Sequence, residues 1–240
     1  MRRPIHLLGT LLTVAGVLTL VWALLVWQWQ DPFTALYTLY QQHKLASRYH
    51  KIADAYHPIL ATRRQGGPGQ GQRLSAREVA VERRLVALDA RRYRHTLHTG
   101  SPLGRIKVPR LGLNAVLVTG TDHDSLTKGP GWYMGSFLPG AGKLMYIAGH
   151  RTTYLAPFAH IDNLRPGDKV MIEVPYGTFV YRVRYHKIVP SDDVAQLRPG
   201  THEVVKLQAC HPRFFATQRY IVYAFPVQVV PKGGKAYAVG

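Results

Sequence analysis

Residues 5–27 form an almost unbroken apolar run, which restricts the structure of this chain more than any other segment. A bilayer core offers no water to backbone N–H and C=O groups, so a spanning segment satisfies them within a helix. About 23 residues are enough to cross roughly 30 Å of hydrocarbon in that form. The run exceeds a typical signal-peptide core and no small-residue cleavage site follows it, which favours a retained transmembrane anchor over a cleaved signal peptide.

The charges on either side of this run predict its orientation. Arg2 and Arg3 precede it, whereas the twenty residues that follow it carry only Asp31 and Lys44 as charged side chains. Lys and Arg are retained on the cytoplasmic side of a membrane. We therefore expect residues 1–4 to be a cytoplasmic tail, residues 5–27 the anchor of a single-pass protein of the cell membrane, and the remainder extracytoplasmic.

Residues 28–98 have the pattern of two helices with a break between them. Asp31 and Pro32 supply an N-cap and a first-turn proline, and the helical spacing of apolar residues predicts a helix to about residue 61. The glycine-rich segment 66–72 breaks it. The sequence SARE at residues 75–78 is a capping box for a second helix that ends near Leu97. We expect a helical juxtamembrane stalk; a regulatory segment is the alternative.

From residue 99 onward the pattern changes to short strands. Apolar or alternating runs are separated by Pro, Gly and Asp turns, at residues 105–108, 115–118, 143–148, 169–174, 179–185, 202–207 and 219–224. Many short strands with little helix between them predict a mainly β domain, either a sandwich or a closed barrel. Closure leaves no exposed strand edge, so we expect a β-barrel in residues 99–240.

The net charge of +18 is spread along the chain, without a dense basic tract. A protein that binds nucleic acid concentrates its charge on one helix or tail, so no nucleic-acid partner is expected. A dispersed charge beside a membrane fits attraction to anionic lipid or cell-wall polymer.

Cys210 is the only cysteine of the chain and is expected outside the membrane. An exported protein with an unpaired cysteine has either an intermolecular bridge or a reactive thiol, which makes Cys210 a candidate nucleophile. Arg219 opens the next predicted strand, where a cation can favour the thiolate and bind a developing oxyanion. A His is the usual proton-transfer partner. His150 lies at a strand end and His211 is adjacent to Cys210 but on the opposite strand face, yet with twelve histidines the residues alone do not decide.

Several motifs in the same order resemble the sortase family, most closely class E. They are GPGW at residues 129–132, AGHRTTY at 148–154, LRPGD at 164–168, and CHPRF at 210–214 followed by RYIV at 219–222. The resemblance covers about residues 104–228. It implies a closed eight-stranded sortase-like β-barrel with short helices, a membrane-anchored cysteine transpeptidase, and a catalytic set of His150, Cys210 and Arg219. It implies no cofactor, and the few acidic residues of this domain give no reason to expect a metal.

The family's chemistry implies the partners. Cys210 would cleave an LPxTG-type or LAxTG-type sorting motif between Thr and Gly, and the thioacyl enzyme would pass the sorting-signal protein to an amine of a peptidoglycan precursor or a pilin. We expect Thr152, Thr153, Tyr154 and Ala209 to line the substrate pocket, although a structural loop role is the alternative for the first three. The segment KLQAC departs from the family's usual hydroxyl-containing TLTTC, and Trp132 stands where relatives often have His.

Three alternatives remain open from the sequence. A hydrolytic cysteine peptidase would use the same Cys-His pair and release a free acid, and a non-catalytic membrane-anchored surface protein would not need Cys210. The triplet of Asp31, Pro32 and Phe33 also resembles the lid motif of pilus-building sortases, although the N-cap interpretation explains it more simply.

Overall fold

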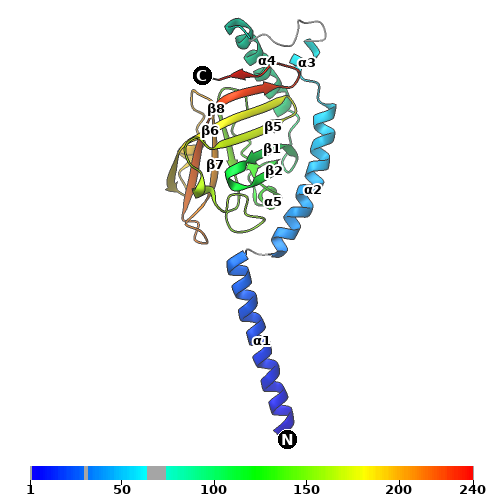
Figure 1. The fold of residues 1–240 in the computed structure, drawn as a ribbon, viewed down its shortest axis with the longest axis vertical. Coiled ribbons are helices and arrows are strands. Elements are labelled where there is room, and N and C mark those ends of the chain that lie inside the picture. The colour runs from blue at the N-terminus through cyan, green and yellow to red at the C-terminus, as the bar shows by residue number, and fades with distance from the viewer. Residues whose placement is uncertain (1, 30–31, 64–73, 240) are drawn as a thin grey trace.

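The computed structural model describes residues 2–29, 32–63 and 74–239, so Asp31 and the predicted glycine-rich break at 66–72 lie outside the described residues. Helix α1 (Arg2–Trp29) extends away from the rest of the chain (Figure 1). Within it, His6–Leu24 has a mean hydropathy of 2.2 and is not buried by any other part of the protein. By length and composition this helix fits a membrane anchor.

Three further helices follow: α2 (Pro32–Ala55), α3 (Ile59–Arg63) and α4 (Ala76–Arg94). The predicted helix to residue 61 is wrong in one respect, because it ends at Ala55 and restarts after Pro58. Proline disfavours helical backbone in the residue before it and has no N–H for the helical ladder. The predicted capping box is confirmed: the Glu78 N–H donates to Ser75 Oγ, and the Ser75 N–H donates to the Glu78 carboxylate.

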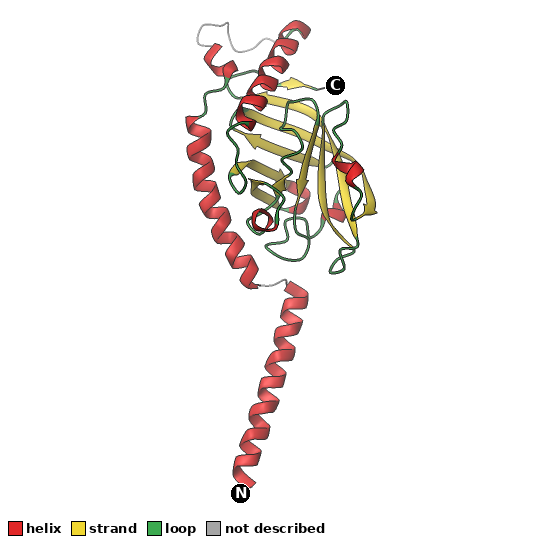
Figure 2. Cartoon of the chain, turned by 180° about the vertical axis from the view of Figure 1, so that it is seen from behind, coloured by secondary structure: helices red, strands yellow, loops and turns green. Residues whose placement is uncertain are grey.

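Helices α2 and α4 both pack on the β domain (Figure 2). Leu45 and Tyr49 of α2 form a small apolar cluster with two valines of the sheet. Val86, Ala90 and Tyr93 of α4 belong to the main core. The helices therefore share buried surface with the barrel, and the division of the chain at residues 28–98 and 99–240 stays a prediction.

The β domain is a closed barrel, as predicted. Its strands are β1 (Pro102–Val108), β2 (Leu113–Thr119), β3 (Gly131–Trp132), β4 (Leu144–Ala148), β5 (Lys169–Val174), β6 (Gly177–Pro190), β7 (Val204–His211), β8 (Gln218–Pro231) and β9 (Tyr237–Ala238). Neighbours follow the order β6-β5-β1-β2-β3-β4-β7-β8, and pairing of β6 with β8 closes the eight strands, with β9 added beside β8. Each of the seven predicted runs overlaps a strand, although residue 143 precedes β4 and residues 202–203 precede β7. The two-residue strands β3 and β9 are too short to show a pattern.

Short helices fill the connections: α5 (His123–Leu126), η1 (Pro109–Leu111), η2 (Ile161–Asn163) and η3 (Val194–Leu197). The alternation of side chains along β7 sets the position of the candidate nucleophile. Val205, Leu207 and Ala209 are fully buried in the core. Because alternate residues of a strand face opposite sides, Gln208 and Cys210 point away from that core.

Candidate active site

Cys210 and Arg219 are direct partners in the antiparallel pairing of β7 with β8. Side chains of directly opposed residues project from the same face of a sheet, so the thiol and the guanidinium are neighbours. Arg219 Nη1 donates to the backbone carbonyls of Ala216 at 2.7 Å and Gln218 at 2.9 Å. These bonds anchor the guanidinium to the loop that connects the two strands.

His150 follows β4, which pairs in parallel with β7 so that Ala148 lies opposite Gln208. The last bond of this pairing is from the Gly149 N–H to the Gln208 carbonyl, at 3.0 Å. A Cβ at Gly149 would come within 2.7 Å of the Phe158 ring, so glycine is required for this close packing. His150 lies two residues after Ala148, and Cys210 lies two residues after its partner Gln208. The sheet order β4-β7-β8 therefore brings the three sequence-predicted residues to adjacent positions at one end of the barrel.

The imidazole of His150 lies in a half-buried environment beside Tyr154, with ring centroids 5.0 Å apart. Burial, and secondarily the nearby His123, lower the pKa of His150 below its ordinary value of 6.5. Within the described parts of the chain, His150 Nε2 is buried without a hydrogen-bond partner. A neutral imidazole with an uncommitted nitrogen can take up or release a proton at a reacting group.

The loop after His150 has an unusual backbone. Tyr154, Leu155 and Ala156 are consecutive non-glycine residues with positive φ, at 53°, 60° and 37°. Such conformations cost on the order of 1–3 kcal/mol each and persist only where surrounding contacts hold them. One such contact is from helix α2: the Tyr154 N–H donates to Thr34 Oγ1 at 3.2 Å.

The predicted pocket residues separate into two groups. Thr152, Thr153 and Tyr154 are half-buried in the loop that follows His150. Ala209 is placed elsewhere, because its side chain is fully buried in the barrel core, on the opposite face of β7 from Cys210. On the face that Cys210 shares, the neighbouring side chain is Gln208, whose Oε1 accepts a 2.6 Å hydrogen bond from the Tyr146 hydroxyl.

The structure also brings to the site a residue that the sequence did not reveal. Arg151 is only 3% exposed, and its Nη1 donates to the Cys210 carbonyl at 3.2 Å. Its Nη2 forms a 3.0 Å ion pair with Asp162, which is carried by η2. Its position directly after His150 was visible in the sequence, but no local pattern links it to partners 11 and 59 residues away.

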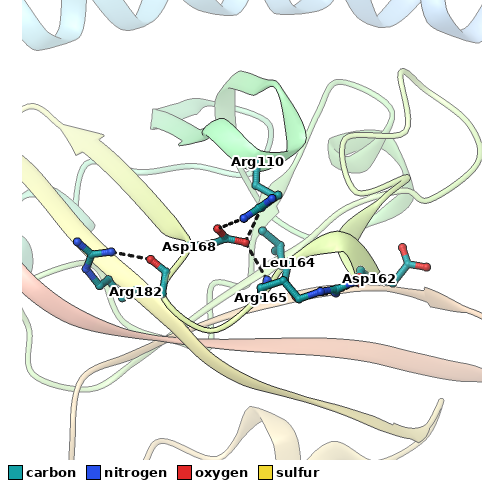
Figure 3. Close-up of polar contacts among 7 residues, drawn as sticks. Arg110, Asp162, Leu164, Arg165, Asp168 and Arg182 are labelled. Carbon is teal, nitrogen blue, oxygen red and sulfur yellow. Dashed lines mark hydrogen bonds and ion pairs between the residues drawn. The ribbon is translucent and has the colours of Figure 1, made fainter.

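The LRPGD turn fixes the segment that carries Asp162 (Figure 3). Arg110 binds the Asp168 carboxylate through two hydrogen bonds of 2.9 and 3.0 Å, and the Arg165 N–H donates to the same carboxylate. The bonds from Arg110 hold the pKa of Asp168 below its ordinary value. The Asp162 carboxylate points away from this cluster in Figure 3, which leaves it to the ion pair with Arg151.

Among residues 2–29, 32–63 and 74–239, no three or more His, Cys, Asp or Glu side chains gather in a way that could hold a metal ion. The candidate site presents a thiol, an imidazole and two guanidinium groups around one strand end.

Both the sequence and the fold of this chain are similar to those of known proteins. Residues 106–227 match the family model of the sortase domain, which is just over half of the chain. The chain is 33% identical over 130 residues to sortase D of Bacillus subtilis (strain 168), covering 52% of this chain and 64% of that protein. It is also 33% identical over 95 residues to sortase SrtE1 of Streptomyces coelicolor, covering 36% and 27%. It thus spans less than two thirds of the length of either relative.

The solved structure of sortase E1 from Streptomyces coelicolor, with a tripeptide in the active site, is similar with a TM-score of 0.52 and 25% identity. The superposition covers 56% of this chain and 93% of the other.

Proposed function

Because this chain belongs to the sortase family, we propose that it is a cysteine transpeptidase with Cys210 as nucleophile, His150 as proton-transfer group and Arg219 as substrate-orienting cation. The observation that carries this proposal is the pairing of β4, β7 and β8, which sets Arg219 opposite Cys210 and puts His150 two residues beyond the last β4–β7 pair, although up to 69 positions separate them.

The reaction has two stages. In the first, His150 takes the proton of the Cys210 thiol, Sγ attacks the Thr carbonyl carbon of a sorting motif, the Thr–Gly amide bond breaks, and the Gly amine leaves with that proton from His150. In the second, an amine nitrogen attacks the thioester carbonyl, gives a proton to His150, and displaces the Cys210 thiolate as the new amide forms. The N–H groups of Arg219 that do not bind the loop carbonyls face the carbonyl oxygen that becomes negative in each stage.

The substrates belong to the same proposal. The cleaved motif is of the LPxTG or LAxTG type, and the acceptor is an amine of a peptidoglycan precursor or of a pilin. Thr152, Thr153 and Tyr154 line the binding groove, and Gln208 takes the place beside the nucleophile that Ala209 leaves. The assignment to class E is part of the proposal; it is supported by the AGHRTTY and CHPRF motifs, while a class D relative matches at the same identity.

The arrangement in the cell is likewise proposed: residues 1–4 in the cytoplasm, 5–27 in the membrane, 28–98 as a helical connection and 99–240 as the catalytic domain outside. The apolar helix α1 and the arginines that precede its span support this orientation.

The test uses the full chain in detergent micelles with LPxTG and LAxTG peptides, with and without an added amine. We expect a covalent adduct on Cys210 in mass spectrometry and an amine-linked product, both absent in Cys210→Ala. Release of free acid alone, unaffected by the amine, would identify a hydrolytic peptidase. No adduct and no cleavage of either peptide by the folded protein would contradict the proposal.

A further inference from the structure

Arg151 is a buried cation at the junction of the two strand ends that carry His150 and Cys210. The backbone pairing of β4 with β7 ends at the bond from Gly149 to Gln208. Beyond that bond, the two segments are linked by the Arg151 side chain, whose Nη1 donates to the Cys210 carbonyl. Arg151 thus directly follows His150, the candidate proton-transfer group, and binds the backbone of Cys210, the candidate nucleophile.

The same guanidinium contacts His211, the residue after the nucleophile. Arg151 Nη1 and His211 Nδ1 are 3.0 Å apart. A guanidinium can only donate, so His211 Nδ1 accepts and its ring proton is on Nε2. The Tyr220 ring of β8 lies 5.8 Å from Arg151 Cζ, within the range of a cation–π contact. Arg151 therefore binds groups on both β7 and β8.

Asp162 compensates for the burial of the Arg151 charge by pairing with its Nη2. An unpaired buried charge is strongly unfavourable, and an ion pair with good hydrogen-bond geometry is needed to retain it. The Asp162 side chain is 50% exposed, so it pairs with Arg151 from the surface. The LRPGD turn holds η2 in place (Figure 3), and Arg165 Nη1 donates to the Asp162 carbonyl at 2.6 Å.

We propose that Arg151 is a positioning residue that holds the ends of β4 and β7 together and thereby sets the distance between the His150 imidazole and the Cys210 thiol. Its effect on turnover rests on the proposed function; its effect on the thiol does not. The planar, multiply donating guanidinium is required, because an ammonium group cannot bind the Cys210 carbonyl, His211 and Asp162 in the same arrangement.

The first experiment needs no sorting substrate. Since Cys210 is the only cysteine, the rate of alkylation of the full chain by iodoacetamide reports on this thiol alone. Arg151→Lys and His150→Gln are measured singly and together in a double-mutant cycle. We expect Arg151→Lys to change the alkylation rate several-fold when His150 is present. In the His150→Gln background the change should be less than about twofold, because no imidazole is left whose distance from the thiol Arg151 could set.

Equal effects of Arg151→Lys in the two backgrounds would overturn the proposal, because Arg151 would then act on Cys210 independently of His150. The matched control is Arg105→Lys, the same change at an arginine of β1 that bonds to Asn114. It is expected to leave the rate unchanged in both backgrounds. If Arg151→Lys does not fold by circular dichroism, Asp162→Asn replaces it in the cycle, since the change at a half-exposed residue weakens the same anchor.

The second experiment separates positioning from substrate binding. With a peptide that the wild-type chain processes, Arg151→Lys is expected to lower kcat by about 10- to 100-fold, the scale of a misplacement near 1 Å, with KM nearly unchanged. An increase in KM with unchanged kcat would assign Arg151 to substrate binding and contradict the proposal. If no peptide is turned over by the wild-type chain, the proposed function fails while the alkylation cycle still tests the role of Arg151.

Discussion

The surroundings of His150 lower the pKa of its imidazole. Burial disfavours the imidazolium, and His123 adds repulsion when it is charged, so the pKa of His150 lies below 6.5. As the pH falls through 6.5, an unfolded chain takes up this proton first, so the stability contributed by neutral His150 is complete above that pH and decreases below it. In the folded protein His150 is thus neutral at pH 7, ready to accept the proton of a thiol.

Replacement of His123 by Gln tests this electrostatic contribution. The variant is expected to raise the pKa of His150 toward its ordinary value, because one of the two causes of its depression is removed. The acid limb of the kcat/KM profile should then move to higher pH, and the histidine ring signals in NMR titrations, assigned with His150→Gln, should move with it. His160→Gln, at an exposed site after the same loop, is the control. A His150 midpoint that is unchanged or lower in His123→Gln would contradict the assignment.

Not all of these residues were equally accessible from the sequence. Cys210 and Arg219 followed from an unpaired thiol and from two predicted strands that a short turn joins. His150 required the family resemblance, because strand periodicity carries no information on the parallel pairing of β4 with β7, 60 residues apart. Neither the strand pattern nor the family resemblance identified Arg151, since its partners are distant in sequence. Ala209 was assigned to the pocket as a neighbour of Cys210, but alternation along the strand turns its side chain into the core.

At the level of elements, helix α2 is hydrogen-bonded to the barrel backbone through polar side chains. The Gln42 side-chain amide donates to the carbonyls of Val116 at 3.1 Å and Lys128 at 2.7 Å, and its oxygen accepts from the Val116 N–H at 2.7 Å. It thereby bonds both backbone groups of one β2 residue, as a neighbouring strand would. Thr38 and Thr34, four and eight residues earlier, also bond to barrel loops. The sequence predicted the helix but not its docking, because this stripe is polar and shows no amphipathic signal.

Gln42→Leu is expected to destabilise the protein. The substitution leaves the Val116 and Lys128 backbone groups without these partners, and each unsatisfied buried group costs about 1–3 kcal/mol. A total loss of about 3 kcal/mol or more for the three groups lowers Tm by at least roughly 6–12 °C for a domain of this size. The measurement is thermal unfolding of the full chain in detergent micelles, followed by circular dichroism. Gln41→Leu, the same change at the adjacent position, should shift Tm by less than about 1 °C, as is usual for changes away from such contacts. Equal shifts for both variants would show that the amide bonds to β2 contribute nothing specific.

At the level of the whole molecule, the apolar helix α1 ends close in space to the candidate active site, through Thr34 of helix α2. Thr34 lies five positions after Trp29, the end of α1, and five steps along a chain span at most roughly 18 Å. Thr34 in turn bonds to the Tyr154 backbone, in the loop that begins at His150. The candidate site therefore lies near the end of α1 whatever the angle between α1 and α2, and in the proposed arrangement this is where the chain leaves the membrane. This position suits substrates that are themselves held at the outer membrane surface, and the positive net charge adds attraction to anionic lipid.

The proposed orientation predicts which side of the membrane carries the thiol. A membrane-impermeant maleimide added to intact cells that produce the full chain should label Cys210, since the arginines that precede the apolar span of α1 favour an extracytoplasmic catalytic domain in the proposed orientation. The control moves the single thiol to the other side: Pro4→Cys in a Cys210→Ala background keeps both arginines and should react only after the membrane is permeabilised. Labelling is followed by mass shift on a gel, with denatured samples to show that each thiol is reactive once exposed. Labelling of Pro4→Cys but not of Cys210 in intact cells would reverse the topology, and with it remove access of the site to any cell-wall acceptor.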